Sequence, residues 1–127
     1  MSRNYKAILI PHDNSKQVEV VDMDGEDYRE ITRKVAADPV NGLFSCSTIG
    51  GGRCSLWYDD EGLFNQPTNV NTRAMALWAS LDRVNIRDFA VPLVGDYLVT
   101  GPADDEGYTT DVPLDIVALL IAKPVPE

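Results

Sequence analysis

The first part of the chain alternates short apolar runs with turn residues, a pattern typical of strands. A continuous apolar run at residues 5–10 predicts a buried strand, and polar–apolar alternation at residues 17–20 predicts a half-buried one. The turn residues at 11–15 join the two into a β-hairpin. Two more strands are predicted at residues 46–49 and 53–58, and the three glycines between them suit a tight hairpin because glycine tolerates positive φ.

An amphipathic helix is predicted after the first hairpin. Asp24 stands where a capping side chain belongs, and the acidic residues after it suit the positive end of the helix dipole. The apolar positions that then recur at helical spacing are Tyr28, Ile31 and Val35. Because Pro39 disfavours helical geometry in the residue before it, we expect the helix to end near Ala37.

The second half of the chain predicts two further helices and one strand. Asn71 or Thr72 can cap the first of these helices. Its apolar face consists of Ala74, Leu77, Trp78 and Leu81. Residues 93–101 predict a turn into a buried strand. Residues 114–122 are apolar enough for a packed helix or a strand, and Asp111 as a cap favours the helix.

The resulting order, β-β-α-β-β-α-β-α, predicts an α+β fold with a mostly antiparallel sheet, about three helices and cover on one face. The chain has 127 residues, a length that suits one domain. We expect that domain to comprise residues 1–123, and residues 124–127 to fray as a tail.

The net charge of −9 changes which partners are plausible. An acidic surface repels nucleic-acid phosphates and anionic membranes, so we expect no direct nucleic-acid binding and no membrane binding. The acidic surface remains compatible with a basic partner. No apolar run is long enough for a signal peptide or a membrane span, which predicts a cytoplasmic protein with reduced Cys46 and Cys54. The predicted hairpin would place the two cysteines across from each other, and whether they pair is left open.

The sequence contains no complete catalytic set. Its only histidine, His12, is interpreted as an exposed turn residue, and nucleophilic catalysis needs a base beside the nucleophile. Two cysteines and one histidine are too few for a zinc site, and the acidic turns at 59–62 and 104–107 lack the spacing of a calcium loop. The sequence therefore predicts no cofactor, no metal and no enzymatic activity.

The strongest candidate for recognition is the amide-rich loop at residues 65–73 with the aromatic residues near it. Its candidate binding residues are Tyr58, Asn65, Asn69 and Arg73. Amides and one arginine offer a fixed set of donors and acceptors, and aromatic rings supply contact area. The alternative is that these amides cap the following helix and close the loop.

Several short motifs resemble those of a known family. They are the hairpin at 5–21, the Asp60-Glu61-Gly62 turn, the helix start Asn69-x-x-Thr72-x-Ala74, the segment 94–101 and the acidic turn after it. In these the chain resembles DUF3846, small domains encoded largely by bacteriophages and mobile elements of actinobacteria and related bacteria. The glycine-rich hairpin that contains Cys46 and Cys54 departs from that pattern. The resemblance implies a phage accessory protein in the host cytoplasm, and it transfers no activity and no catalytic residues.

Three hypotheses on function follow. The leading one is a non-enzymatic phage accessory protein that binds a host protein in host take-over or anti-defence. The first alternative is an acidic DNA-mimic antirestriction protein, which would use the acids of residues 19–30 and 104–115 and is compatible with a homodimer. The second alternative is a module that sequesters a nucleotide or small molecule with the loop at 65–73.

Overall fold

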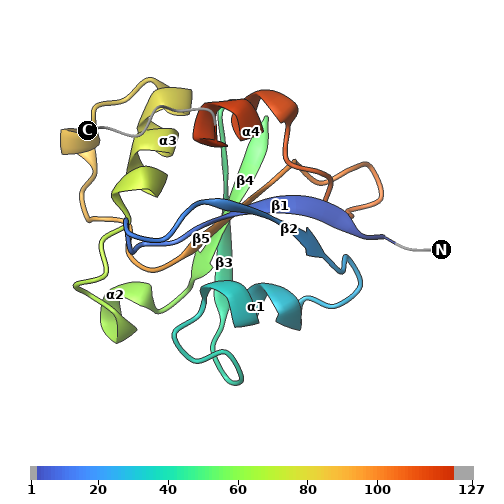
Figure 1. The fold of residues 1–127 in the computed structure, drawn as a ribbon, viewed down its shortest axis with the longest axis horizontal. Coiled ribbons are helices and arrows are strands. Elements are labelled where there is room, and N and C mark those ends of the chain that lie inside the picture. The colour runs from blue at the N-terminus through green and yellow to red at the C-terminus, as the bar shows by residue number, and fades with distance from the viewer. Residues whose placement is uncertain (1–2, 122–127) are drawn as a thin grey trace.

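The computed structural model describes residues 3–121 and contains one antiparallel sheet in the order β2-β1-β5-β4-β3. Its strands are β1 (Tyr5–Ile10), β2 (Glu19–Met23), β3 (Phe44–Ile49), β4 (Cys54–Asp59) and β5 (Tyr97–Thr100). Strand β5 comes late in the sequence, yet it lies at the centre of the sheet and pairs with both hairpins. It therefore joins the β1–β2 hairpin to the β3–β4 hairpin (Figure 1).

The helices are α1 (Arg29–Val35), α2 (Gly62–Asn65), α3 (Thr72–Asp82) and α4 (Leu114–Ile121), with a 3-10 turn, η1 (Ile86–Asp88). Three of them have seven residues or more, and with the strands they give the order ββαββαβα. The predicted α+β class and element order are confirmed. The short α2 and η1 fall where only loops were predicted. The predicted domain end at 123 and the tail at 124–127 lie outside the described residues.

Helix α1 begins later than its sequence predicts. The carboxylate of Asp24 accepts a hydrogen bond from the backbone N–H of Glu26 at 2.9 Å, and the carbonyl of Asp24 accepts one from Asp27 at 3.2 Å. These bonds close a turn at residues 24–27, and the helix starts only at Arg29. Aspartate side chains favour such turns as well as caps, and here the turn forms instead of the cap.

The β3–β4 hairpin has a register that separates the two cysteines. Its three turn glycines have φ values of 65°, 68° and 92°, as the sequence predicts for a tight glycine turn. Cys46 faces Trp57 and Cys54 faces Ile49, so the prediction that the two cysteines lie opposite each other is wrong. Cys46 is exposed and Cys54 is buried, and both thiols are free.

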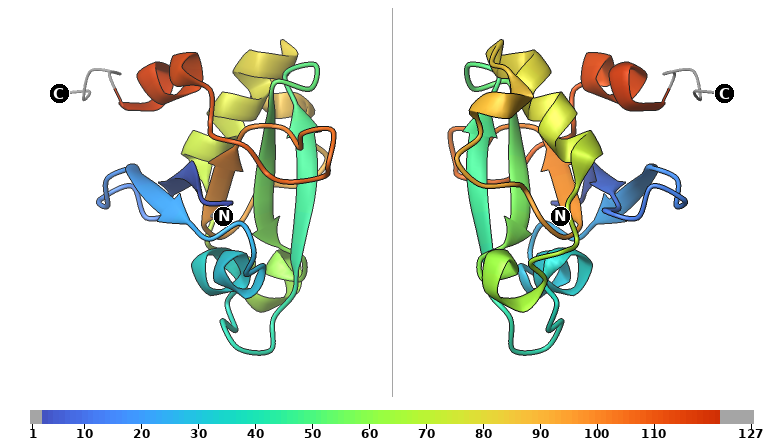
Figure 2. Two further views of the ribbon diagram at one scale, coloured as in Figure 1. Left: turned by 90° about the vertical axis from the view of Figure 1, so that its right-hand side faces the viewer. Right: turned by 90° about the vertical axis from the view of Figure 1, so that its left-hand side faces the viewer.

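The sheet is covered on both faces, not on one as predicted. Successive strand residues point to opposite faces, so Leu56 and Val99 join one buried cluster while Leu98 joins another. Helices α3 and α4 contribute to the first cluster and α1 to the second. Figures 1 and 2 show α3 and α4 together on one side of the sheet and α1 on the other. None of the helices within residues 3–121 combines the length and apolar character needed to cross a bilayer.

Candidate functional site

Asn71 is the buried anchor of the loop that leads into α3. Its Oδ1 accepts a hydrogen bond from the backbone N–H of Ala74 at 2.9 Å, which confirms the predicted helix cap. Its Nδ2 donates to the carbonyls of Ile10 and Gly95, both at 2.9 Å. One side chain therefore fixes the start of α3 against the end of β1 and the turn before β5.

A second network closes the loop from the other end. The carboxylate of Asp59 is buried and accepts hydrogen bonds from the backbone N–H of Ala37 and from Nε2 of Gln66, both at 3.0 Å. The Oε1 of Gln66 in turn accepts from Nδ2 of Asn69 at 3.1 Å. The amides of Gln66 and Asn69 thus hold the loop closed, as the alternative interpretation of this loop proposed.

The four candidate binding residues do not form one site. Tyr58 lies on β4, where its hydroxyl is 2.8 Å from Oγ of Ser47. Asn65 is exposed at the end of α2, and Asn69 is bonded within the loop. Arg73 lies on α3 and contacts the β1–β2 turn. The structure therefore separates them into a cleft beside α2, the loop itself and a pocket beside α3.

The cleft beside α2, here called the α2 cleft, has a volume of about 450 Å³. It is lined by Tyr58, Asp59, Asp60, Glu61, Gly62, Leu63, Phe64, Trp78, Val91, Pro92, Leu93, Val94 and Tyr97. The rings of Tyr58 and Tyr97 stack with their centroids 5.2 Å apart. Burial, and then the neighbouring Tyr58, raise the pKa of Tyr97, so its hydroxyl stays neutral. The walls of the cleft are mainly aromatic and aliphatic.

Large apolar side chains are exposed at the same end of the molecule. Phe64 on α2 is 77% exposed and Val40, in the loop between α1 and β3, is 83% exposed. Leu43 is more than half exposed, and Leu63 is about half exposed. The α1–β3 loop and the start of α2 are tied together, because the backbone N–H of Asp60 donates to the carbonyl of Leu43 at 3.0 Å. Figure 1 shows α2 and this loop at one end of the protein.

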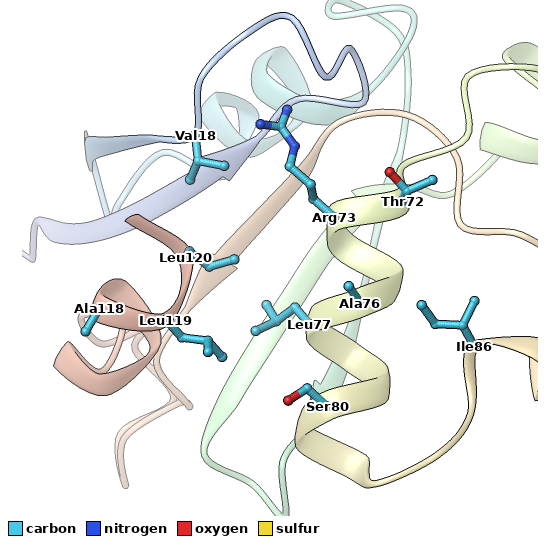
Figure 3. A pocket seen from close by; sticks show the side chains of 10 residues that line it. All are labelled: Val18, Thr72, Arg73, Ala76, Leu77, Ser80, Ile86, Ala118, Leu119 and Leu120. Atoms are coloured by element: carbon cyan, nitrogen blue, oxygen red, sulfur yellow. The ribbon is translucent and has the colours of Figure 1, made fainter. Parts of the chain in front are cut away.

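The larger concavity, here called the α3–α4 pocket, has a volume of about 740 Å³. It is lined by Val18, Thr72, Arg73, Ala76, Leu77, Ser80, Ile86, Ala118, Leu119 and Leu120. Figure 3 shows Leu77, Leu119 and Leu120 between α3 and α4, with Arg73 and Val18 at one end and Ser80 at the other, while Ile86 lies on the side of α3 away from α4. Sequence reasoning missed this pocket, because it depends on how Val18 and α4 pack against α3.

Arg73 is the one charged side chain among the residues that line the α3–α4 pocket in the described part of the chain. Its Nη2 donates to the carbonyls of Pro11 at 2.7 Å and Asp13 at 3.1 Å. Its Nε is buried and has no hydrogen-bond partner. Buried N–H donors are nearly always paired in native proteins, so this unpaired one is a cost to the fold.

His12 is not the exposed turn residue that the sequence predicts. Its side chain is 32% exposed, and Nδ1 lies 2.8 Å from Oδ1 of Asp96, which also accepts from the His12 backbone N–H at 3.0 Å. Two bonds from one residue to one carboxylate fix the turn after β1 against the turn before β5. Neither residue is among those that line the α2 cleft or the α3–α4 pocket.

The cysteines offer little nucleophilic character. Burial raises the pKa of the Cys54 thiol to about 11, and partial desolvation also raises the pKa of the Cys46 thiol, although that side chain is the more exposed of the two. A thiol that stays protonated at neutral pH is a poor nucleophile and a poor metal ligand. Within residues 3–121, no three His, Cys, Asp or Glu side chains gather closely enough to hold a metal ion.

The fold defines a class: a small α+β domain with a central antiparallel sheet, which here carries apolar concavities beside α2 and beside α3. The family model of DUF3846, a domain of unknown function, matches residues 5–124, and the chain belongs to this family. No curated protein and no solved structure matches the chain.

Proposed function

We propose that this protein is a non-enzymatic binding protein that docks an apolar, basic segment of a partner protein at the α2 cleft. The observation that supports it most directly is Phe64, an aromatic side chain that is 77% exposed at the mouth of an aromatic-walled cleft. Large aromatic residues beside such clefts are typical centres of protein–protein interfaces.

The energetics favour a covered state of this end of the molecule. Fully burying a side chain such as Phe or Leu contributes roughly 1.5–3 kcal/mol relative to leaving it in water. Phe64, Leu63, Val40 and Leu43 all remain at least about half exposed at this end. Exposed apolar residues gathered in one region mark interaction sites more often than those scattered singly.

The charges around these residues select the partner. Asp38, Asp60 and Glu61 are exposed beside the apolar side chains, in a chain whose net charge is −9. Complementary charges speed association and exclude wrong partners. The segment that fits is one in which apolar anchors are flanked by lysine or arginine.

The proposed cellular context of this binding comes from the resemblance of the sequence motifs to those of the family. If the family's phage and mobile-element context holds for this chain, the partner is a host protein in the bacterial cytoplasm, and binding serves host take-over or anti-defence.

The test is selection of a displayed random-peptide library on the full chain, followed by affinity measurements on the enriched peptides. We expect the peptides to combine apolar and basic residues. Phe64→Ser should weaken their binding by at least about tenfold, while Leu114→Ser, at a residue that is 86% exposed on α4, should leave it unchanged. Equal losses in both variants, or enrichment of peptides without basic residues, would contradict the proposal.

A second candidate is the acidic DNA mimic, which one observation favours. The acidic segments at 19–30 and 104–115 both contact β1, one on each side of the strand. Lys6 bonds Asp22 through Nζ at 2.6 Å and donates its backbone N–H to Asp111 at 2.8 Å. Arg3 pairs with Glu106 at 3.4 Å. Figure 2 shows both segments near the N-terminal end of β1.

A competition assay distinguishes the two candidate functions. A DNA mimic would release a basic DNA-binding protein from labelled DNA, and the double variant Asp105→Asn with Glu106→Gln would release it less. Phe64→Ser would not change that release. Sedimentation of the free protein would show whether the homodimer that suits a mimic exists.

A further inference from the structure

We propose that the α3–α4 pocket binds an unbranched aliphatic carboxylate, with its chain between the two helices and its carboxylate at Arg73. This site is separate from the α2 cleft, and no residue lines both.

The argument begins with the electrostatic state of Arg73. Its side chain is partly buried, and its hydrogen-bond partners are the backbone carbonyls of Pro11 and Asp13. The Oδ1 of the Asp13 carboxylate instead accepts hydrogen bonds from the backbone N–H and the hydroxyl of Ser15. Within residues 3–121, no carboxylate lies within ion-pair distance of Arg73. In a chain with a net charge of −9, this partly buried cation has no counter-ion among residues 3–121.

An unpaired cation in a partly buried place is costly, and so is a buried donor without an acceptor. Arg73 combines both, because its Nε is buried and has no partner. A ligand carboxylate at this end of the pocket would supply a counter-ion to the guanidinium through its more accessible nitrogens. Arg73 and Thr72 also form the first turn of α3, whose positive dipole end favours an anion.

The rest of the pocket is suited to a hydrocarbon chain. Beyond Arg73 its lining is aliphatic apart from the hydroxyls of Thr72 and Ser80, and it contains no aromatic ring among the described residues. Its volume of about 740 Å³ lies in the range of small-molecule sites. From Thr72 to Ser80 the helix advances about 12 Å, roughly the length of an extended decanoate. Figure 3 shows Leu77, Leu119 and Leu120 along that path.

The same lining argues against a nucleotide, the ligand that sequence reasoning assigned to the loop at 65–73. A base needs a ring or an edge-on set of donors and acceptors, and a polyphosphate needs several cations. The pocket has one cation and aliphatic walls. An aliphatic amine would be repelled by Arg73.

The first experiment titrates the isotope-labelled full chain with decanoate below its micelle concentration, and compares decan-1-ol, decylamine and acetate. We expect saturable shifts of the backbone amides of Ala76, Leu77 and Leu119, and an affinity for decanoate at least about tenfold above that for decan-1-ol. Acetate should not saturate the site, because it has no chain to bury. Equal binding of decanoate and decan-1-ol, or no saturable shift, would overturn the proposal.

Two variants with matched controls place the ligand. Arg73→Met should remove the preference for decanoate over decan-1-ol, while Arg87→Met, at an exposed arginine next to Ile86, should keep it. Ala118→Trp should fill the pocket and weaken both ligands by at least about tenfold, whereas Ala103→Trp should not. If Arg73→Met does not fold, the wild-type comparison and the tryptophan pair still decide the matter. Decanoate binding that survives Ala118→Trp would overturn the assignment.

Discussion

Asn71 and Arg73 lie two residues apart at the start of α3, one in the loop and one in the α3–α4 pocket. They differ in how many of their donors and acceptors have hydrogen-bond partners. Asn71, in the loop, is fully buried and bonds Ala74, Ile10 and Gly95 with both ends of its amide. Arg73, in the α3–α4 pocket, contacts backbone carbonyls with one nitrogen while its Nε is buried without a partner.

This difference separates structural polar groups from candidates for binding. A side chain whose donors and acceptors are all satisfied within the fold has nothing left for a ligand, and removing it leaves its partners unpaired. A partly exposed charged side chain that lacks a counter-ion within the described residues can take one from a ligand. The amides of the loop at 65–73, which looks richest in recognition chemistry in the sequence, belong mostly to the first kind.

The largest expected effect tests the structural half of this comparison. Asn71→Ala removes the cap of α3 and leaves the carbonyls of Ile10 and Gly95 without their donor. We expect a loss of about 3 kcal/mol or more in the free energy of unfolding, measured by urea denaturation. A loss below about 1 kcal/mol would show that water replaces the amide and that the loop is not anchored there.

Asp59 provides the next test, at the other end of the same loop. Asp59→Ala leaves the backbone N–H of Ala37 and the amide of Gln66 without an acceptor. We expect a loss of about 2 kcal/mol, measured in the same urea assay. Asp59→Asn, which keeps one carbonyl oxygen, is the matched control and should lose less. An equal loss in both variants would indicate that the charge of Asp59, and not its hydrogen bonds, holds the loop.

Arg73→Met tests the other half of the comparison through stability alone. The variant loses two bonds to turn carbonyls, yet it also removes a buried donor with no partner and a partly buried cation that has no counter-ion in the described part of the chain. Because these contributions oppose each other, we expect a loss below about 1 kcal/mol. A loss as large as that of Asn71→Ala would place Arg73 among the structural groups and weaken the case for its role in binding.

Local patterns in the sequence predict much of this fold, because they depend on neighbours along the chain. The apolar spacing of α3, its cap at Asn71 and the glycine turn of the second hairpin are all of this kind. The predicted start of α1 was wrong because an aspartate such as Asp24 can either close a turn or cap a helix. The sequence does not distinguish these roles, and only the three-dimensional context decides between them.

The candidate site was predicted less well because its contacts are long-range. Arg73 was predicted as a candidate binding residue, but nothing in the sequence indicated its partners Pro11 and Asp13, which lie 62 and 60 residues earlier. The α3–α4 pocket needs Val18, α3 and α4 together, and no local pattern contains that information. The cover on both faces of the sheet likewise depends on long-range packing, of α1 against one face and of α3 and α4 against the other.

The smallest expected effect lies at Asn65, and it sharpens the boundary between the closed loop and the α2 cleft. Asn65 is exposed at the end of α2, next to the exposed Phe64. Because neither side chain is packed, Asn65→Ala and Phe64→Ser should each change the free energy of unfolding by no more than about 0.5 kcal/mol. Of the two, only Phe64→Ser should weaken the selected peptides strongly, since the ring supplies apolar area that the amide lacks. A stability loss in Asn65→Ala close to that of Asp59→Ala would instead add Asn65 to the groups that close the loop.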